Sequence, residues 1–275
     1  MKAEYRLAVV VPAWNEAQTI AEVITLAHSV LNRSALGAFE IVAVDNGSTD
    51  ATAAIARSSG AVLVSEPRRG YGQACLSGIA RAAGADILVF MDADGSDDPD
   101  GIPRLVAPII EGRADLVIGS RELGVSERGA HPWHAVLGTR MCVALMNLTI
   151  GTRATDLGPF RAIRAEALRE LGMSDATFGW TTEMQIKVHR AGLRTVEVPV
   201  DYRRRRGGVS KISGSWPQSV KAGNRILGLI LRQAFAQSPD RVRSGAAAHF
   251  QGRGAAGFAP HPGKRNESEQ DRSPR

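Results

Sequence analysis

Residues 87–99 read ILVFMDADGSDDP, an apolar run that ends abruptly in acid. The apolar half is typical of a buried parallel strand, and Pro99 closes the polar turn that follows it. Four aspartates crowd into this turn, which is either a solvated helix start or the site of a divalent cation. Taken alone, the turn is better explained by solvation. As metal ligands, Asp92 and Asp94 would suit Mg²⁺ or Mn²⁺, which prefer oxygen and leave positions for water and substrate phosphates.

Strands and helices alternate on both sides of this stretch, up to about residue 121. Each short apolar run is followed by a polar turn and then by a segment with helical periodicity. This alternation predicts a doubly wound, mainly parallel α/β sheet with helices on both faces, as in Rossmann-like folds. The expected strands are 7–11 (ended by Pro12), 39–44, 61–66, 87–91 and 114–121, and helices are expected from near Asn15–Glu16, from Thr49 or Asp50, within 68–84 and over 100–112.

A polar loop follows each of these five strands. In open α/β sheets, ligands bind outside the carboxyl ends of the strands, so these loops should meet at one edge. Five converging polar loops are harder to explain by solvation than any one of them. The loops are 12–16, 45–50, 68–72, 92–99 and 119–121.

The chain of 275 residues is long enough for one large α/β domain, and its hydrophobic content of 44% is ordinary. The two cysteines are most simply buried thiols, and with the six histidines they show no zinc-like spacing. We see no signal peptide and no run of 18 apolar residues, so we expect a cytoplasmic protein without a transmembrane helix.

The net charge of +6 would attract anionic substrates, an anionic membrane surface or nucleic acid. No aromatic residues are interleaved with the basic run at 203–206 for base stacking, so we expect no nucleic-acid partner.

The strict alternation lapses after Arg121. A loop is expected over 122–132, followed by a helix over 133–148 with Met141, Leu145 and Leu148 on one side. A loop, a short strand, two helices and a further strand complete a predicted catalytic domain, residues 1–215. An amphipathic helix is expected over 216–237, which packs on the domain or lies on an anionic membrane surface, and a disordered tail over 238–275.

Several residues could carry chemistry, and each also has a simpler structural explanation. Gly70, beside Arg68 and Arg69, could form a tight turn or let the backbone approach an anionic ligand. Asp45 could open an Asx-turn or bind a base or ribose. Asp156 could shape a turn, or could orient or deprotonate an acceptor.

Two further features lie in the second half of the chain. Glu183 is either an exposed residue of a predicted helix or part of the site. Four consecutive arginines, 203–206, cannot all point one way, so about half of them should be solvated. With Lys211, this glycine-bearing loop could close over a diphosphate or meet a lipid phosphate.

Taken together, these segments resemble family 2 glycosyltransferases of GT-A fold, and among them the dolichol-phosphate mannosyltransferase and polyprenyl-phosphate glycosyltransferase branch. The resemblance covers about residues 7–215. The matching segments, in the family's order, are VPAWNE, VDNGSTD, RRGYGQA, MDADGSDDP, IGSR, DLGPFRA and YRRRRGGVSKISG.

The resemblance implies a role for each matching residue. A nucleotide-sugar pocket would be lined by residues from the first four segments, with Asp92 and Asp94 holding Mg²⁺ or Mn²⁺ on the diphosphate. Catalytic residues would come from the later segments, and a basic loop would contact phosphates near the acceptor. The pocket residues are Pro12, Asn15, Glu16, Asp45, Arg68, Arg69, Gly70, Asp92 and Asp94; the catalytic candidates are Arg121, Asp156 and, by a loose match, Glu183; the basic loop supplies Arg203, Arg204, Arg205, Arg206 and Lys211.

Three features depart from the family pattern. Ser96 stands where lipid-phosphate mannosyltransferases commonly have Gln, and Asn46 stands where a second Asp is usual. Many relatives end in transmembrane helices, which this chain is not expected to have. Within the acidic turn, Asp92 and Asp94 are the expected metal ligands, whereas Asp97 and Asp98 are expected to start the next helix.

The activity that the resemblance implies is metal-dependent, inverting transfer of a hexose to a polyprenyl phosphate, as in cell-envelope glycan synthesis. The donor would be of the GDP-mannose or UDP-glucose type, and the protein would work at the inner face of the membrane. A phosphate acceptor is already ionised near neutral pH and needs positioning, whereas a hydroxyl acceptor needs a base, for which Asp156 is the candidate. A soluble acceptor and a non-catalytic nucleotide-binding module are the alternatives.

Overall fold

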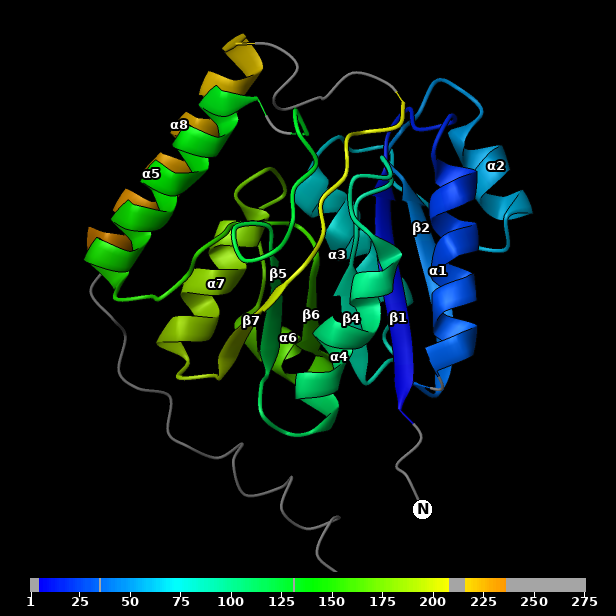
Figure 1. The fold of residues 1–275 in the computed structure, drawn as a ribbon, viewed down its shortest axis with the longest axis horizontal. Coiled ribbons are helices and arrows are strands. Elements are labelled where there is room, and N and C mark those ends of the chain that lie inside the picture. Colours follow the sequence, from blue (N-terminus) through cyan, green and yellow to red (C-terminus); the bar gives the residue numbers. More distant parts are fainter. Residues whose placement is uncertain (1–4, 35, 131, 208–215, 236–275) are drawn as a thin grey trace, which may run out of the picture. The chain divides into compact units, whose positions relative to one another are not determined.

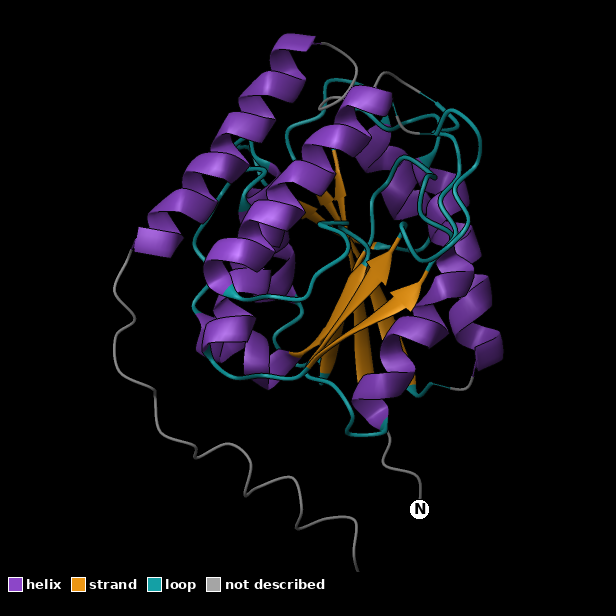
Figure 2. Cartoon of the chain, turned by 60° about the vertical axis from the view of Figure 1, so that its left-hand side comes forward, coloured by secondary structure: helices purple, strands orange, loops and turns teal. Residues whose placement is uncertain are grey.

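The computed structural model describes residues 5–34, 36–130, 132–207 and 216–235. In these residues a seven-stranded sheet lies between two layers of helices (Figures 1 and 2). The strand order is β3-β2-β1-β4-β6-β5-β7, and of the described strands only β6 runs antiparallel to its neighbours. The bounds are β1 Arg6–Ala13, β2 Ala38–Asp45, β3 Val62–Ser65, β4 Ile87–Phe90, β5 Leu116–Ser120, β6 Arg161–Arg164 and β7 Thr195–Pro199.

Helices cover both faces of this sheet. α1, α2 and α4 pack on the face to which Val9 and Val11 point, and α3, α6 and α7 pack on the face to which Ala8 and Val10 point. Burial on both faces explains the continuous apolar runs of the parallel strands. The bounds are α1 Ile20–Ser34, α2 Thr52–Ser58, α3 Tyr71–Arg81, the 3₁₀ turn η1 Pro99–Gly101, α4 Ile102–Ile110, α5 Trp133–Ile150, α6 Ala165–Leu171, α7 Trp180–Arg190 and α8 Trp216–Phe235.

Antiparallel β6 brings a distant loop to the rim, the edge of the sheet at which the parallel strands end. Its first residue, Arg161, pairs with Phe90 at the end of β4 and with Ile118 of β5. The loop before β6, residues 151–160, therefore meets the carboxyl ends of β4 and β5. A parallel strand would have placed this loop at the opposite edge.

Two boundaries predicted near the first strand are wrong. β1 continues past Pro12, and α1 begins at Ile20 instead of near Asn15. The Val10 carbonyl points toward β4, where it accepts from the Met91 N–H. Pro12, two residues further on, also faces β4, but it lies beyond Val10, the last residue of β1 that pairs with β4. Its missing N–H therefore removes no sheet bond. Asn15 has a left-handed φ of 53°, which a helix does not allow.

Two other helices also differ from the prediction in their bounds. α2 starts at Thr52, whose N–H donates to Asp50 Oδ1 at 3.0 Å. The helix predicted over 100–112 is split into η1 and α4. Asp98 begins it, as predicted, because its carboxylate accepts from the Asp100 N–H at 3.2 Å.

The helix α5 buries one side and exposes the other, and the sequence pattern did not say which side is buried. Its buried side carries Cys142, Val143 and Met146, which pack with residues of α7 and α8. Met141 and Leu148, which the sequence pattern places on one side of this helix, are 64% and 84% exposed. Figure 1 shows α5 and α8 side by side beyond α7.

Part of the predicted organisation lies outside the described residues. Lys211, residues 236–237 and the predicted tail over 238–275 belong to this part. The domain boundaries at 215 and 237 remain predictions. Among the helices that the structure describes, none has the length and apolar character needed to cross a bilayer.

Candidate active site

The acidic turn after β4 folds its carboxylates onto one another. Asp97 Oδ2 accepts from the Asp92 N–H at 3.0 Å, and Asp94 Oδ1 accepts from the Ser96 N–H at 2.8 Å. Burial, followed by the charges of Asp94 and Asp97, raises the pKa of Asp92 well above its usual range. Burial also raises the pKa of Asp97 to about 7. A cation would relieve this crowding.

This donor set fits Mg²⁺ or Mn²⁺ bound together with a substrate. Within residues 5–34, 36–130, 132–207 and 216–235, no three His, Cys, Asp or Glu side chains are grouped to hold a metal ion by themselves. Asp92 and Asp94 offer hard oxygen ligands at a strand end, and Mg²⁺ takes one or two protein carboxylates and completes its shell with phosphates and water.

Asp97 does not help to start the next helix, which corrects the prediction made for it together with Asp98. Its side chain is 3% exposed and holds the backbone of Asp92. Ser96, at the position of the missing Gln, donates its hydroxyl to Asp94 Oδ1 at 2.5 Å. Both residues therefore shape the turn that presents Asp92 and Asp94.

The four arginines 203–206, here called the basic strap, lie over this turn. The Arg203 N–H donates to the Ser96 carbonyl at 2.8 Å. The Arg205 guanidinium spans two acids, 3.1 Å from Glu16 Oε1 and 2.5 Å from Asp94 Oδ2. Arg205 thus provides a positive charge at a carboxylate proposed to bind the metal.

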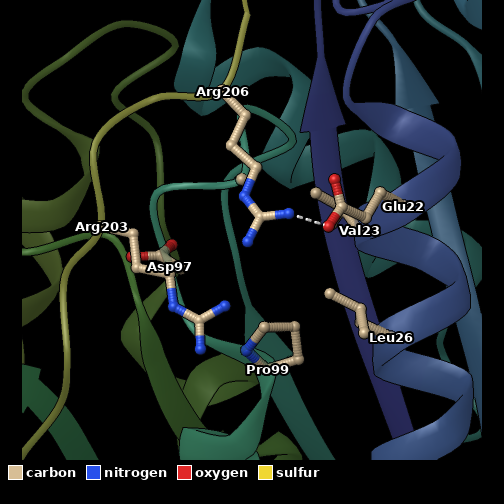
Figure 3. Close-up of a pocket in the computed structure, with 8 residues that line it drawn as sticks. Glu22, Val23, Leu26, Asp97, Pro99, Arg203 and Arg206 are labelled. Atoms are coloured by element: carbon tan, nitrogen blue, oxygen red, sulfur yellow. Dashed lines mark hydrogen bonds and ion pairs between the residues drawn. The ribbon is translucent and has the colours of Figure 1, made fainter.

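The other strap residues hold neighbouring elements together. Arg203 pairs with Asp98 at 2.6 Å, and Arg206 pairs with Glu22 of α1. Figure 3 shows both guanidinium groups beside a cleft between α1 and the acidic turn. Arg204 is exposed, and its backbone N–H donates to Glu127. Three of the four arginines bind carboxylates, and two of the four, Arg204 and Arg206, are exposed, in agreement with the prediction that about half of them are solvated.

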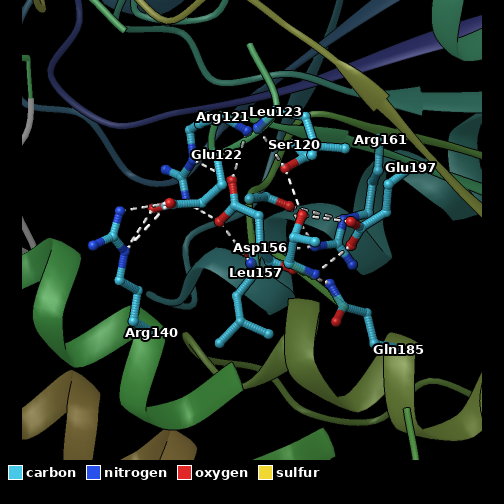
Figure 4. A network of polar contacts seen from close by, with 12 residues as sticks. Ser120, Arg121, Glu122, Leu123, Arg140, Asp156, Leu157, Arg161, Gln185 and Glu197 are labelled. Carbon is cyan, nitrogen blue, oxygen red and sulfur yellow. Dashed lines mark hydrogen bonds and ion pairs between the residues drawn. The ribbon is translucent and has the colours of Figure 1, made fainter. Parts of the chain in front are cut away.

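Asp156 and Arg121 form a tightly bound pair at the rim (Figure 4). Asp156 is 1% exposed; its Oδ2 accepts from Arg121 Nε at 2.7 Å and its Oδ1 from the second guanidinium nitrogen at 2.6 Å. Burial alone would raise the pKa of Asp156, but the charge and hydrogen bonds of Arg121 outweigh it and lower the pKa. Asp156 is therefore poorly suited to act as a base and well suited to orient Arg121.

Tyr202 packs beside the Arg121–Asp156 pair. Its ring lies 5.2 Å from the Arg121 guanidinium carbon, and its backbone forms an isolated bridge with Asp97. Tyr202 therefore links the acidic turn to the pair and leads directly into the basic strap. Sequence reasoning missed this aromatic residue, although it opens the matching segment YRRRR.

Arg161 is a second residue that sequence reasoning missed. It is fully buried and donates to the carbonyls of Gly158 at 3.1 Å and Thr181 at 2.9 Å. Burial lowers its pKa to about 10. Gln185 of α7 donates to the Asp156 carbonyl at 3.0 Å. Together these bonds fix the loop that carries Asp156 (Figure 4).

The predicted nucleotide-binding residues of the first two loops are brought together. Asn15 Oδ1 accepts from the Thr49 N–H at 2.8 Å, which joins the loop after β1 to the loop after β2. Asp45 Oδ1 accepts from the Ser48 N–H at 3.0 Å, as in the simpler Asx-turn explanation. Glu16 is 7% exposed and contacts Arg205.

Arg68 and Arg69 differ in their environment. Arg68 binds Glu66 at 2.9 Å, which lowers the pKa of Glu66. The guanidinium of Arg69 stacks on Trp14 with 4.1 Å between its central carbon and the ring centroid. Asn46, the second departure from the family pattern, donates to the Arg68 carbonyl at 2.7 Å, which an ionised Asp could not do.

The glycines of RRGYG have a packing role. A Cβ on Gly70 would lie 2.1 Å from the Ala176 carbonyl oxygen, and one on Gly72 would lie 1.9 Å from the Asp175 carbonyl oxygen. Gly70 also has a φ of 147°. These contacts explain the glycines without a ligand, so Gly70 as a nucleotide contact stays a prediction.

Glu183 is occupied away from the acidic turn. It is 4% exposed, accepts from the Asp175 N–H at 2.8 Å and pairs with Lys187 at 2.8 Å. Burial would raise its pKa, but Lys187 and the hydrogen bonds around it lower the pKa. It is buried rather than exposed, and its contacts are those of a structural residue that holds the loop before α7.

The comparisons with known proteins agree with this arrangement. The family model described as Glycosyl transferase family 2 matches residues 8–172. An uncharacterized glycosyltransferase of Mycobacterium tuberculosis is 38% identical over 221 residues, which cover 78% of this chain and 94% of that protein. The undecaprenyl-phosphate mannosyltransferase of Micrococcus luteus is 32% identical over 226 residues, covering 76% and 88%.

Solved structures show the same fold. Glucosyl-3-phosphoglycerate synthase from M. tuberculosis, in complex with Mn²⁺, UDP-glucose and phosphoglyceric acid, aligns with a TM-score of 0.70 and 25% identity, covering 87% of this chain and 82% of that one. The mainly parallel sheet with its antiparallel β6 is accordingly a GT-A fold. The family match, the identity to proteins named as glycosyltransferases and the shared fold lead to the same conclusion. The chain belongs to glycosyl transferase family 2 and is a glycosyltransferase.

Proposed function

We propose that this enzyme transfers a hexose from a nucleoside-diphosphate sugar to the phosphate of a polyprenyl phosphate, with Mg²⁺ or Mn²⁺ as cofactor and inversion at the anomeric carbon. The observation that carries the choice of acceptor is the Arg121–Asp156 pair. Both carboxylate oxygens of Asp156 accept from Arg121, so this carboxylate is not available as a base. The Arg121 guanidinium is instead held as a positive charge beside the acidic turn. This suits an acceptor that is already ionised.

The donor would lie along the rim, with its diphosphate at the acidic turn. Asp92 and Asp94 would hold the metal, which supplies charge stabilisation for the leaving nucleoside diphosphate. Asp97 holds the backbone of Asp92, and Ser96 holds the carboxylate of Asp94. Asp45, Glu16 and residues of the joined first loops would contact the nucleoside.

The acceptor would approach from the side of Arg121. A phosphate monoester has a second pKa of about 6 and is largely dianionic at neutral pH, so it needs positioning more than deprotonation. Arg121, oriented by Asp156 and Tyr202, would bind one of its oxygens. Arg205 would leave Asp94 when the metal binds and turn to a phosphate. The relatives named as undecaprenyl-phosphate mannosyltransferase and polyprenol monophosphomannose synthase support a lipid phosphate.

A second candidate acceptor is a small soluble molecule that carries a hydroxyl and an anionic group. The likeness to glucosyl-3-phosphoglycerate synthase favours it. The engaged state of Asp156 weighs against it, since a hydroxyl acceptor needs a proton acceptor in the transition state.

Product analysis separates these candidates. The protein is incubated with Mn²⁺ and either GDP-mannose or UDP-glucose, in parallel with a detergent-dispersed polyprenyl phosphate or phosphoglycerate, and the products are identified by mass spectrometry. We expect a hexosyl phosphoprenol whose anomeric configuration by NMR is opposite to that of the donor. Transfer to phosphoglycerate alone would favour the second candidate. No transfer from either donor to either acceptor would contradict both candidate functions.

A further inference from the structure

The exposed large apolar side chains are concentrated in one part of the described structure. The described residues include ten exposed large apolar side chains; eight lie in the loop after β5, on α5 or on α8, and the other two are Trp14 and Leu26. Scattered exposed apolar residues need no explanation, but a contiguous group marks an interaction surface. The eight residues are Leu123, Val125, Trp133, Leu137, Met141, Leu148, Leu227 and Leu231.

On α5 these residues form a stripe. Trp133, Leu137, Met141 and Leu148 are spaced by four, four and seven residues, which places them on one side of a helix. Their exposed fractions are 71%, 52%, 64% and 84%. The other side of α5 is buried against α7 and α8. A surface helix is normally polar on its outer side, so an apolar outer side indicates a partner.

The charge of the two helices shows what kind of partner suits this surface. Residues 133–150 and 216–235 contain no Asp or Glu, and their basic residues are Arg140, Lys221, Arg225 and Arg232. Arg140 pairs with Glu122 and Arg225 with Asp175, so part of this charge is balanced locally. Apolar side chains among basic residues, without acidic ones, are the composition of helices that lie on anionic bilayers.

The surface is connected to the candidate site. Val125 follows the rim residue Arg121 closely in sequence, and its carbonyl accepts from the Tyr202 N–H at 3.0 Å. The Glu122–Arg140 pair, at 2.8 Å, joins the same loop to α5. A bilayer in contact with this surface would therefore have its phosphate groups near the loop that links Arg121 to the basic strap.

We propose that the loop residues Leu123 and Val125, with the outer sides of α5 and α8, form a surface that docks on an anionic lipid bilayer. This inference rests on the proposed function, because a polyprenyl phosphate is held in such a bilayer. Docking through this surface brings the rim to the acceptor's phosphate and leaves the opposite edge of the sheet in water. The test also distinguishes two other partners that could cover this surface, a second copy of the chain and the chain's own residues 236–275.

The test measures binding to vesicles in the absence of donor and acceptor. The full chain is sedimented with vesicles of phosphatidylglycerol and phosphatidylcholine, and with phosphatidylcholine vesicles alone. The variant L137Q/M141Q/L148Q loses three exposed anchors and should bind the anionic vesicles at least about tenfold more weakly. The matched control is A54Q, at an exposed position of α2 outside this surface. The single variant L148Q, at the most exposed position, serves if the triple variant does not fold.

Each outcome bears on the proposal. Sedimentation of the wild type with anionic vesicles, weakened by the stripe variants and unchanged by A54Q, supports it. No sedimentation of the wild type, or equal sedimentation of all variants, overturns it. A dimer in light scattering that the stripe variants convert to monomer, without vesicle binding, would assign the surface to a second copy. A chain ending at residue 235 that binds vesicles while the full chain does not would assign it to residues 236–275. Turnover with a short-chain prenyl phosphate in detergent tests the proposed function independently.

Discussion

Replacing Arg205 by Ala should have opposite effects on binding of the metal alone and binding of the nucleotide with the metal. Arg205 neutralises Asp94 and Glu16 in the absence of a ligand. A divalent cation that binds Asp94 must displace this guanidinium, and in the complete complex the guanidinium would turn to a phosphate. R205A should therefore bind Mn²⁺ more tightly and nucleoside diphosphate with Mn²⁺ more weakly.

The size of the first effect follows from the geometry. The Arg205 nitrogen lies 2.5 Å from Asp94 Oδ2, and the side chains are 24% and 5% exposed. Two charges whose centres are about 4 Å apart interact by about 4 kcal/mol at an effective dielectric constant of 20. Part of this is recovered when the displaced guanidinium keeps Glu16 and gains water, so a net effect of about 2 kcal/mol, or about thirtyfold in Kd, is expected.

The assay is electron paramagnetic resonance of free Mn²⁺ titrated with protein, repeated with UDP or GDP present. R204A is the matched control, because that side chain is exposed and its known bond is made by the backbone N–H. We expect R204A to bind Mn²⁺ like the wild type. Unchanged or weaker Mn²⁺ binding by R205A would refute the idea that Arg205 and the metal compete for Asp94.

Three further expectations concern single side chains. The pKa of Asp97 is raised from 3.8 to about 7, so the native state holds a proton that the unfolded state releases, and metal-free stability should fall as pH rises from about 4 to about 7. D97N should show a smaller decline in thermal melts, since only the raised pKa of Asp92 then contributes, and a decline as large as that of the wild type would refute the assignment. D156N should raise the KM for the phosphate acceptor at least about tenfold, with the donor's Kd unchanged, because Arg121 loses its orientation; a loss confined to donor binding would contradict this. Since a Cβ at position 72 would lie 1.9 Å from a carbonyl oxygen, G72A should destabilise the protein by about 2 kcal/mol or more in urea unfolding; a fully stable variant with impaired nucleotide binding would favour a ligand role for that glycine.

The alternation of strands and helices could be predicted because each strand buries both faces, which leaves continuous apolar runs with a polar loop after each. Alternation with helices also implied parallel strands, so the residues after β1, β2, β4 and β5 were correctly predicted to meet at one edge of the sheet. Asp92 and Asp94 could be singled out because their position depends only on the end of β4.

The rest depended on contacts between distant residues. No local pattern indicates that Arg205 reaches Glu16, 189 residues away, or that Asp97 binds the backbone of Asp92 and not the next helix. The exposed side of α5 could not be predicted either, since that helix is apolar on all sides and the sequence does not show which side meets α8. Glu183 satisfied a loose motif, but its local role at residues 174–175 became visible only with the loop in place.

The most direct test of the account is a matched comparison of wild type and D94N for formation of a hexosyl phosphoprenol. Both proteins receive nucleotide sugar and polyprenyl phosphate, with Mn²⁺ or with a chelator, and the lipid product is quantified by mass spectrometry. We expect product only from the wild type with Mn²⁺, while D94N keeps its fold by circular dichroism and loses at least about a hundredfold in rate. Equal lipid product from D94N, or from the wild type in chelator, would contradict a metal-dependent transfer centred on the acidic turn.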